Sequence, residues 1–233
     1  MNDAGVTARR LVAEAFGTAL LLAAVVGSGI MAERLSGGNV AVALLANAIA
    51  TGGALVALIL TFGPISGAHF NPVVSLSDAW QGRMSWRDAF GYVVAQFLGA
   101  PLGVVLAHVM FGETLAPSRH ARSGVAQWVG ELVATFGLLA VIASGSRRKA
   151  NTTPYAVAAY IVGAYWFTSS TSFANPAVTF ARSLTNTFAG IRPVDVPAFV
   201  VAQMIGAFLA TLLFRWLIPI DLSLPNPAKE SVR

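Results

Sequence analysis

The chain has 233 residues, of which 56% are hydrophobic and only 11% are charged, and its formal net charge is +5. A soluble domain of this length would lack the polar residues needed to cover its surface, so the composition indicates an integral membrane protein. The absence of cysteine excludes disulfide bonds and thiolate metal sites. We expect no metal, no cofactor and no enzyme active site, because no nucleophile constellation, acid/base pair or phosphate-binding loop is present.

Apolar stretches long enough to cross a membrane recur along the chain, since a core of about 30 Å takes roughly 20 helical residues. The six predicted spans are Leu11–Ala32, Val40–Phe62, Phe90–Phe111, Val125–Gly145, Pro154–Phe173 and Pro197–Trp216. Arg9 and Arg10 could open a cleaved signal peptide. Glu14 interrupts that first run and further spans follow, which argues against cleavage.

The distribution of basic residues predicts the orientation of the chain. An even number of spans places both termini on one side of the membrane. The termini and loops of that side carry about ten of the 15 Lys and Arg residues, including Arg83, Arg87, Arg147, Arg148 and Lys149. The positive-inside rule then makes both termini cytoplasmic. We interpret the basic clusters as orientation signals rather than a nucleic-acid site, and we expect membrane lipid, and no nucleic acid, as a partner of the chain.

Two Asn-Pro pairs lie in apolar stretches too short to cross the membrane. These motifs are Asn71-Pro72-Val73 and Asn175-Pro176-Ala177. Asparagine is a favoured N-cap and proline is favoured at the first helical position, so each motif predicts a helix start at membrane depth. The residues before them, 66–70 and 171–174, are expected to be extended and to line a pore with their carbonyl groups.

The two halves of the chain repeat one order of residues: a glutamate, an Asn-Pro motif and a glutamine. The repeated pairs are Glu14 with Glu131 and Gln96 with Gln203. Three spans per repeat is an odd number, so the second copy enters from the opposite side. The predicted repeats, about 8–112 and 124–218, form one domain, 1–218, before a short disordered tail, 219–233. In inverted repeats with broken helices the working site lies near the midplane.

These motifs, in register with six spans, resemble the aquaporin and aquaglyceroporin (major intrinsic protein) superfamily over about residues 8–218. The resemblance implies an all-α integral membrane fold of six transmembrane helices plus two re-entrant half-helices. It also implies a homotetramer whose protomers each hold a pore for small neutral solutes. Asn71 and Asn175 would donate amide hydrogens to the solute; the alternative is that they only cap their helices.

The resemblance also assigns supporting residues. Glu14 and Glu131 would accept hydrogen bonds from the re-entrant loops, or, in a sharper alternative, relay protons. Gln96 and Gln203 would hold helices or loops in place. His69 resembles the loop histidine of the family and is expected to line the pore or pack beside it, rather than bind a metal.

In the superfamily, four positions form the narrowest point of the pore, and by their offset from the Asn-Pro motifs the resemblance places them on Thr51, Gly163, Ser172 and Val178. Members of the superfamily that select water or glycerol carry an arginine where this chain has Val178. With no aromatic or charged residue among the four, we expect a wide constriction. The pattern resembles bacterial aquaglyceroporins encoded in arsenic-resistance operons, which implies a multi-pass protein of the bacterial inner (cell) membrane.

The predicted function is a passive channel for glycerol-like solutes, arsenite, methylated arsenicals and water. Three alternatives remain open from the sequence. They are a water-selective or glycerol-selective channel, a proton-coupled secondary transporter that uses Glu14 or Glu131, and a non-conducting membrane scaffold.

Overall fold

The computed structural model describes residues 3–147 and 152–218. Its helices are α1 (Asp3–Leu35), α2 (Val40–Ser66), α3 (Pro72–Trp80), α4 (Trp86–Phe111), α5 (Val125–Arg147), α6 (Thr153–Phe167), α7 (Pro176–Arg182) and α8 (Val196–Leu217), with a 3-10 turn η1 (Pro193–Asp195) before α8. The predicted tail 219–233 and the basic residues Arg148 and Lys149 lie outside the described residues.

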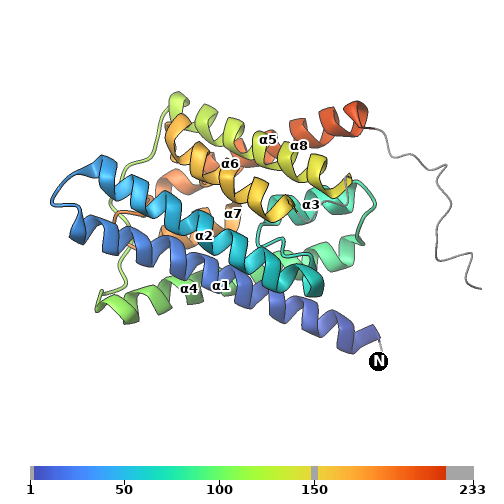
Figure 1. Ribbon diagram of the computed structural model, residues 1–233, viewed down its shortest axis with the longest axis horizontal. Coiled ribbons are helices and arrows are strands. Elements are labelled where there is room, and N and C mark those ends of the chain that lie inside the picture. The colour runs from blue at the N-terminus through green and yellow to red at the C-terminus, as the bar shows by residue number, and fades with distance from the viewer. Residues whose placement is uncertain (1–2, 148–151, 219–233) are drawn as a thin grey trace, which may run out of the picture.

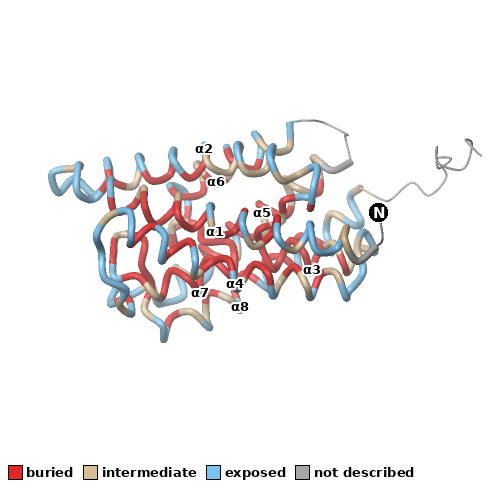
Figure 2. The backbone as a smooth tube through the Cα atoms, turned by 90° about the horizontal axis from the view of Figure 1, so that it is seen from below, coloured by how far each residue is buried: buried red, intermediate tan, exposed pale blue. Residues whose placement is uncertain are grey.

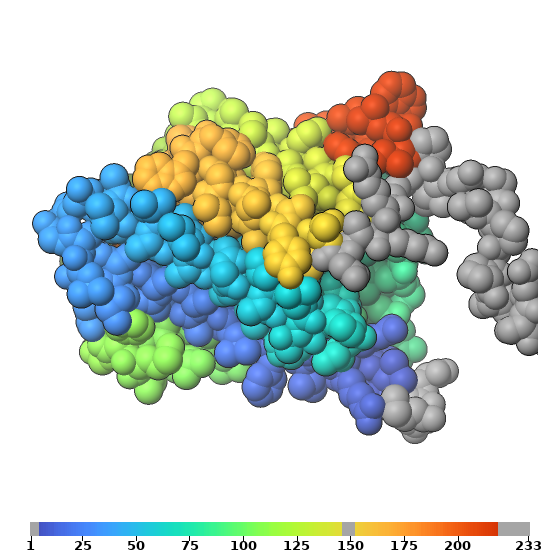
Figure 3. Space-filling model, viewed as in Figure 1, coloured from blue at the N-terminus to red at the C-terminus, as the bar shows by residue number. Residues whose placement is uncertain are grey.

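The long helices run side by side, and the short helices α3 and α7 lie among them (Figure 1). The start of α1 and the end of α8 lie at the same end of this bundle. Helices α3 and α7 occupy opposite halves of its length, so they follow each other along the bundle axis. Helices α2 and α6 together cover one face of the molecule (Figure 3).

Among the described residues, five helical segments are long and apolar enough to cross a membrane: Gly5–Leu35, Val40–Ser66, Trp86–Phe111, Val125–Gly145 and Pro193–Leu217. Helix α6 has 15 residues and spans only about 22 Å. The predicted span 154–173 was therefore too long. Five consecutive Ser and Thr residues, 168–172, follow α6, and such side chains compete for backbone hydrogen bonds and favour a helix end.

Glycine brings the long helices together in the same way in each half. A Cβ atom at Gly99 of α4 would collide with the carbonyl oxygen of Ala15 in α1, and one at Gly206 of α8 would collide with that of Leu132 in α5. Close backbone approach at small residues is the usual packing of helices in membranes. The two contacts are equivalent in the two halves, as an inverted repeat requires.

Buried residues gather on the inward faces of the long helices and in the half-helices, whereas the outward faces are exposed (Figure 2). Large apolar side chains stand on those outer faces, for example Phe16, Leu98 and Phe208. An apolar exterior of this extent fits contact with lipid. The polar side chains Glu14, Gln96, Glu131 and Gln203 are instead fully buried.

Candidate functional site

Each half-helix begins at its Asn-Pro motif. The Asn71 Oδ1 atom accepts a hydrogen bond from the backbone N–H of Val73 at 3.2 Å. The Asn175 Oδ1 atom accepts from Ala177 at 3.0 Å and from Val178 at 3.2 Å. Both asparagines have extended backbone and are followed by proline at the start of the helix, as N-capping chemistry requires.

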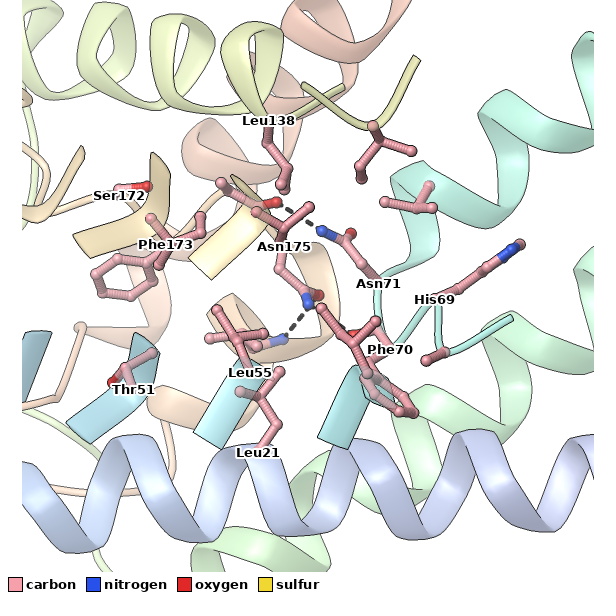
Figure 4. A pocket seen from close by; sticks show the side chains of 18 of the residues that line it. Leu21, Thr51, Leu55, His69, Phe70, Asn71, Leu138, Ser172, Phe173 and Asn175 are labelled. Carbon is pink, nitrogen blue, oxygen red and sulfur yellow. Dashed lines mark hydrogen bonds between the residues drawn. The ribbon is translucent and has the colours of Figure 1, made fainter. Parts of the chain in front are cut away.

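The two half-helices meet tip to tip through their asparagine amides (Figure 4). Asn71 Nδ2 donates to the carbonyl oxygen of Ala174 at 2.8 Å, and Asn175 Nδ2 donates to that of Phe70 at 2.7 Å. Each amide nitrogen carries two hydrogens. Capping uses the oxygen and the contact between the tips uses one hydrogen, so neither contact uses the second hydrogen of each asparagine.

Glu14 fixes the loop before α3. Its carboxylate accepts from the backbone N–H of His69 at 2.9 Å and of Phe70 at 2.7 Å, and from Nε2 of Gln96 at 2.8 Å. The Ser66 hydroxyl donates to it at 2.6 Å. This buried carboxylate is therefore surrounded by donors, which is the condition for keeping a charge inside a membrane protein.

Glu131 does the same for the loop before α7. Its carboxylate accepts from the backbone N–H of Phe173 at 2.8 Å and of Ala174 at 2.9 Å, and from Nε2 of Gln203 at 2.6 Å. The glutamine in turn donates to Thr179 of α7 at 2.7 Å. In each half, the glutamate and its glutamine thus connect two long helices to one re-entrant loop.

The two loops are not simply extended, which corrects the sequence expectation. Residues with positive φ occur in both: Ala68 (51°), Phe70 (49°), Thr171 (62°), Ser172 (50°) and Ala174 (47°). Each such residue costs about 1–3 kcal/mol and persists only where its surroundings hold it, here the two glutamates. The carbonyls of Phe70 and Ala174 do not form a free ladder, because each accepts from the opposite asparagine.

A cavity of about 410 Å³ runs beside the joined tips and is lined by residues of both halves. Figure 4 places Thr51, Ser172 and Phe173 on one side of the asparagine pair and His69 on the other. Between these ends the wall is mostly apolar, from the side chains Leu21, Val25, Leu55, Ile59, Val74, Leu138, Ile142, Val157 and Ile161.

At the end of the cavity nearer the termini, which we call the inner end, polar residues cluster around His69. Its Nδ1 atom lies 3.0 Å from the Ser75 hydroxyl, and its Nε2 atom lies 3.4 Å from a carboxylate oxygen of Asp78. Asp78 is also paired with Arg83, and all three ionisable residues line the cavity. The sequence analysis singled out His69 but missed Asp78 and Arg83 as its neighbours.

At the opposite, outer end, three of the four expected constriction residues line the cavity, namely Thr51, Ser172 and Val178. Gly163 does not. Tyr165, two residues further along α6, takes that place, and its hydroxyl lies 3.3 Å from that of Thr51.

The reason for this correction is helix geometry. A residue two positions along a helix is turned by about 200°, and Gly163 faces Phe167 of its own helix. Counting back from Asn175 passes through the non-helical residues 168–174, so the count alone could not fix which face of α6 turns inward.

Two arginines that the sequence analysis missed reach the outer end. Arg182 lines the cavity one helical turn after Val178 and is 2% exposed. Arg122, from the segment between α4 and α5, donates through its guanidinium to the carbonyl oxygen of Gly190 at 2.8 Å and to that of Ser170 at 3.3 Å. Burial lowers the pKa of Arg122, and the charge of Glu131 opposes that shift.

Comparison with known proteins shows which family shares this architecture. The family described as "Major intrinsic protein" matches residues 3–172 and 155–226. The aquaglyceroporin AqpS of Rhizobium meliloti (strain 1021) is 57% identical over 226 residues, covering 97% of this chain and 94% of that protein. The probable aquaporin TIP2-2 of Oryza sativa subsp. japonica is 31% identical over 214 residues, covering 88% and 85%.

A solved structure shares the fold. The aquaglyceroporin from Plasmodium falciparum superposes with a TM-score of 0.67 at 18% identity, covering 91% of this chain and 97% of that one. The predicted all-α fold and the resemblance on which it rested are confirmed by these matches. The chain belongs to the major intrinsic protein family of membrane channels.

Proposed function

We propose that the protein is a passive channel for small uncharged polar solutes, namely glycerol-like polyols, arsenite, methylated arsenicals and water. The observation that carries the proposal is the cavity beside the two asparagines, each of which keeps one amide hydrogen for a solute. The half-helix starts that meet there each carry about +0.5 charge. A solute that passes them must accept hydrogen bonds and must not be a cation.

The residues of the outer end support a solute larger than water. Val178 stands at the position where an arginine would narrow the passage, and Thr51 and Ser172 beside it are small. Tyr165, Phe173 and Arg182 are the bulky side chains that line the same end. Arsenite at neutral pH is an uncharged trihydroxy compound of glycerol-like polarity, so one passage suits both. The relative that is 57% identical is itself named an aquaglyceroporin.

Proton coupling is the less favoured mechanism. Glu14 and Glu131 each accept hydrogen bonds from two backbone N–H groups and a glutamine. Neither glutamate is among the residues that line the cavity. Protonation would weaken these bonds, which hold the loops that carry Asn71 and Asn175, so the contacts favour a fixed structural role for both carboxylates.

We further infer that residues 1–218 form one channel domain, that four copies assemble as a homotetramer, and that each copy holds its own conduit. The bacterial relative and the apolar exterior support a place in the bacterial cell (inner) membrane. The connection between α3 and α4, which carries Arg83 and Arg87, lies at the same end of the bundle as the start of α1 and the end of α8, which supports a cytoplasmic location for both termini.

A solute panel tests the channel function. Purified protein is reconstituted into lipid vesicles, and uptake of glycerol, arsenite and water is measured by stopped flow against protein-free vesicles. We expect all three rates to rise, with glycerol and arsenite rising together because they share size and polarity. Rates equal to those of protein-free vesicles for all three solutes would refute the proposal, and a rise for water alone would leave only a water-selective channel.

A further inference from the structure

Arg182 is a buried cation without an acidic partner at the outer end of the cavity. Its Nε atom donates to the carbonyl oxygen of Ala189. Within residues 3–147 and 152–218, no acidic side chain lies within ion-pair distance of Arg182 or Arg122, and no partner is found for the terminal nitrogens of Arg182. An isolated buried charge is costly, so its retention beside a solute passage calls for an explanation.

The guanidinium groups of both arginines lie over the ring of Phe173. The guanidinium carbon of Arg182 lies 3.4 Å from the ring centroid, and that of Arg122 lies 5.0 Å from it. Arginine commonly stacks on aromatic faces in this way. Arg122 is then accounted for structurally, because its guanidinium also bonds to the carbonyls of Ser170 and Gly190. The terminal nitrogens of Arg182 have no such role.

The charged groups around this point leave an excess of positive charge. Arg122, Arg182 and Arg192 carry three positive charges, and Glu131 and Asp195 carry two negative ones. Asp195 is paired with Arg192 at 2.9 Å. The Glu131 carboxylate accepts hydrogen bonds from backbone N–H groups of the loop before α7. The net positive charge therefore belongs to Arg122 and Arg182.

One hydroxyl group without a hydrogen-bond partner lines the same end. The Ser172 side chain is 3% exposed, and its Oγ atom has no hydrogen-bond partner in the described part of the chain. Ser172 is the residue before Phe173 and lines the cavity together with Arg182 and Tyr165. A buried hydroxyl without a partner is expensive to keep. A guanidinium, a free hydroxyl and a phenol around one space form a set of donors suited to the oxygen atoms of an anion.

We propose that Arg182, Ser172 and Tyr165 form a binding site for small monovalent oxyanions, and that the channel conducts these anions besides uncharged solutes. The proposal rests on the proposed channel function. The rest of the path is compatible with it, because the half-helix starts are positive and Asp78, the acidic residue of the lining, is already paired with Arg83 and His69. Cations meet positive charge at the outer end and again at the centre.

Methanesulfonate is a suitable probe, because it is a small monovalent oxyanion that stays ionised at neutral pH and cannot cross as a neutral acid. Reconstituted vesicles are shrunk with external potassium methanesulfonate in the presence of valinomycin, which carries the potassium. The rate of re-swelling then reports anion uptake. Glycerol uptake is measured on the same vesicles, so that a failure of the anion site is distinguished from a failure of the channel.

Three variants locate the site. Arg182→Met removes the charge and keeps an unbranched side chain only as far as the position of Nε, and Arg182→Lys keeps the charge. Arg119→Met is the matched control, since Arg119 is an exposed arginine of the segment that also carries Arg122. We expect wild-type uptake of methanesulfonate to exceed that of protein-free vesicles by about tenfold. It should fall to the protein-free rate in Arg182→Met and persist in Arg182→Lys and Arg119→Met.

Glycerol uptake should remain clearly above the protein-free rate in Arg182→Met, because the uncharged solute does not need the cation. The anion site is refuted, with the channel function intact, if wild-type vesicles take up glycerol but not methanesulfonate, or if Arg182→Met takes up both at the wild-type rate. If Arg182→Met does not fold, the comparison of wild type with Arg182→Lys and protein-free vesicles still decides. If wild-type vesicles take up neither solute, the channel function itself fails.

Discussion

Val178 and Tyr165 together determine the width of the outer end. Val178 is held in the first turn of α7, where its backbone N–H donates to Asn175. Tyr165 is buried in α6 and contacts the Thr51 hydroxyl. Both line the cavity, and substitutions at these two positions change its bore from opposite sides.

Val178→Arg is expected to narrow the passage. The longer side chain would enter the cavity one turn before Arg182, where the two like charges also repel each other. We expect glycerol uptake to fall by about tenfold and water uptake by no more than about threefold. Stopped-flow measurement of both rates in one vesicle preparation checks this, with Val178→Leu as the uncharged control. Equal losses of both rates at equal amounts of folded protein would contradict the assignment of Val178.

Tyr165→Ala is expected to widen the outer end, since it removes the phenol that lies against Thr51. Uptake of polyols larger than glycerol should then rise while water uptake changes little. Gly163→Ala is the matched control on the same helix, because Gly163 does not line the cavity. The placement of α6 would be wrong if Gly163→Ala altered polyol uptake and Tyr165→Ala did not.

The contact of α1 with α4 requires a glycine. Gly99→Ala would force a methyl group onto the carbonyl of Ala15, and the same holds for Gly206→Ala and Leu132 between α5 and α8. We expect each substitution to cost about 1–3 kcal/mol of stability, and thermal denaturation of the detergent-solubilised protein measures it. Gly53→Ala is the matched control, since nothing lies within 4 Å of the new methyl group. A loss of stability in the control as large as in Gly99→Ala would contradict the packing argument.

Local chemistry made α3 and α7 predictable, because an Asn-Pro pair specifies both the cap and the first helical residue. The roles of Glu14 and Glu131 as loop acceptors followed from the family resemblance, and the contacts agree with them. The Ser and Thr run 168–172 could have indicated the end of α6, whereas the facing of Tyr165 could not be predicted, since it depends on the path of residues 168–174. The position of Arg122 could not be predicted either, because Arg122 belongs to a segment that is distant in sequence from Phe173, the residue whose ring it contacts.

At the scale of the whole molecule, the start of α1, the end of α8 and the start of α4, where Arg87 lies, are at one end of the bundle, and the segment between α4 and α5, which carries Arg119, is at the other. The chain contains no cysteine, so a single introduced cysteine can be labelled at either end without labelling of native residues. A membrane-impermeant maleimide should label Arg119→Cys in intact spheroplasts and Arg87→Cys only after lysis. Both positions are exposed in the structure. The reverse pattern would contradict cytoplasmic termini.

A passive channel needs a fixed, open path beside the joined half-helix tips, and the kinetics of glycerol movement across the membrane of reconstituted vesicles test for such a path most directly. The account predicts a rate that rises in proportion to the glycerol gradient, is equal for uptake and release, and is unchanged by an imposed pH gradient. A rate equal to that of protein-free vesicles would contradict it, and so would a rate that saturates and follows the pH gradient.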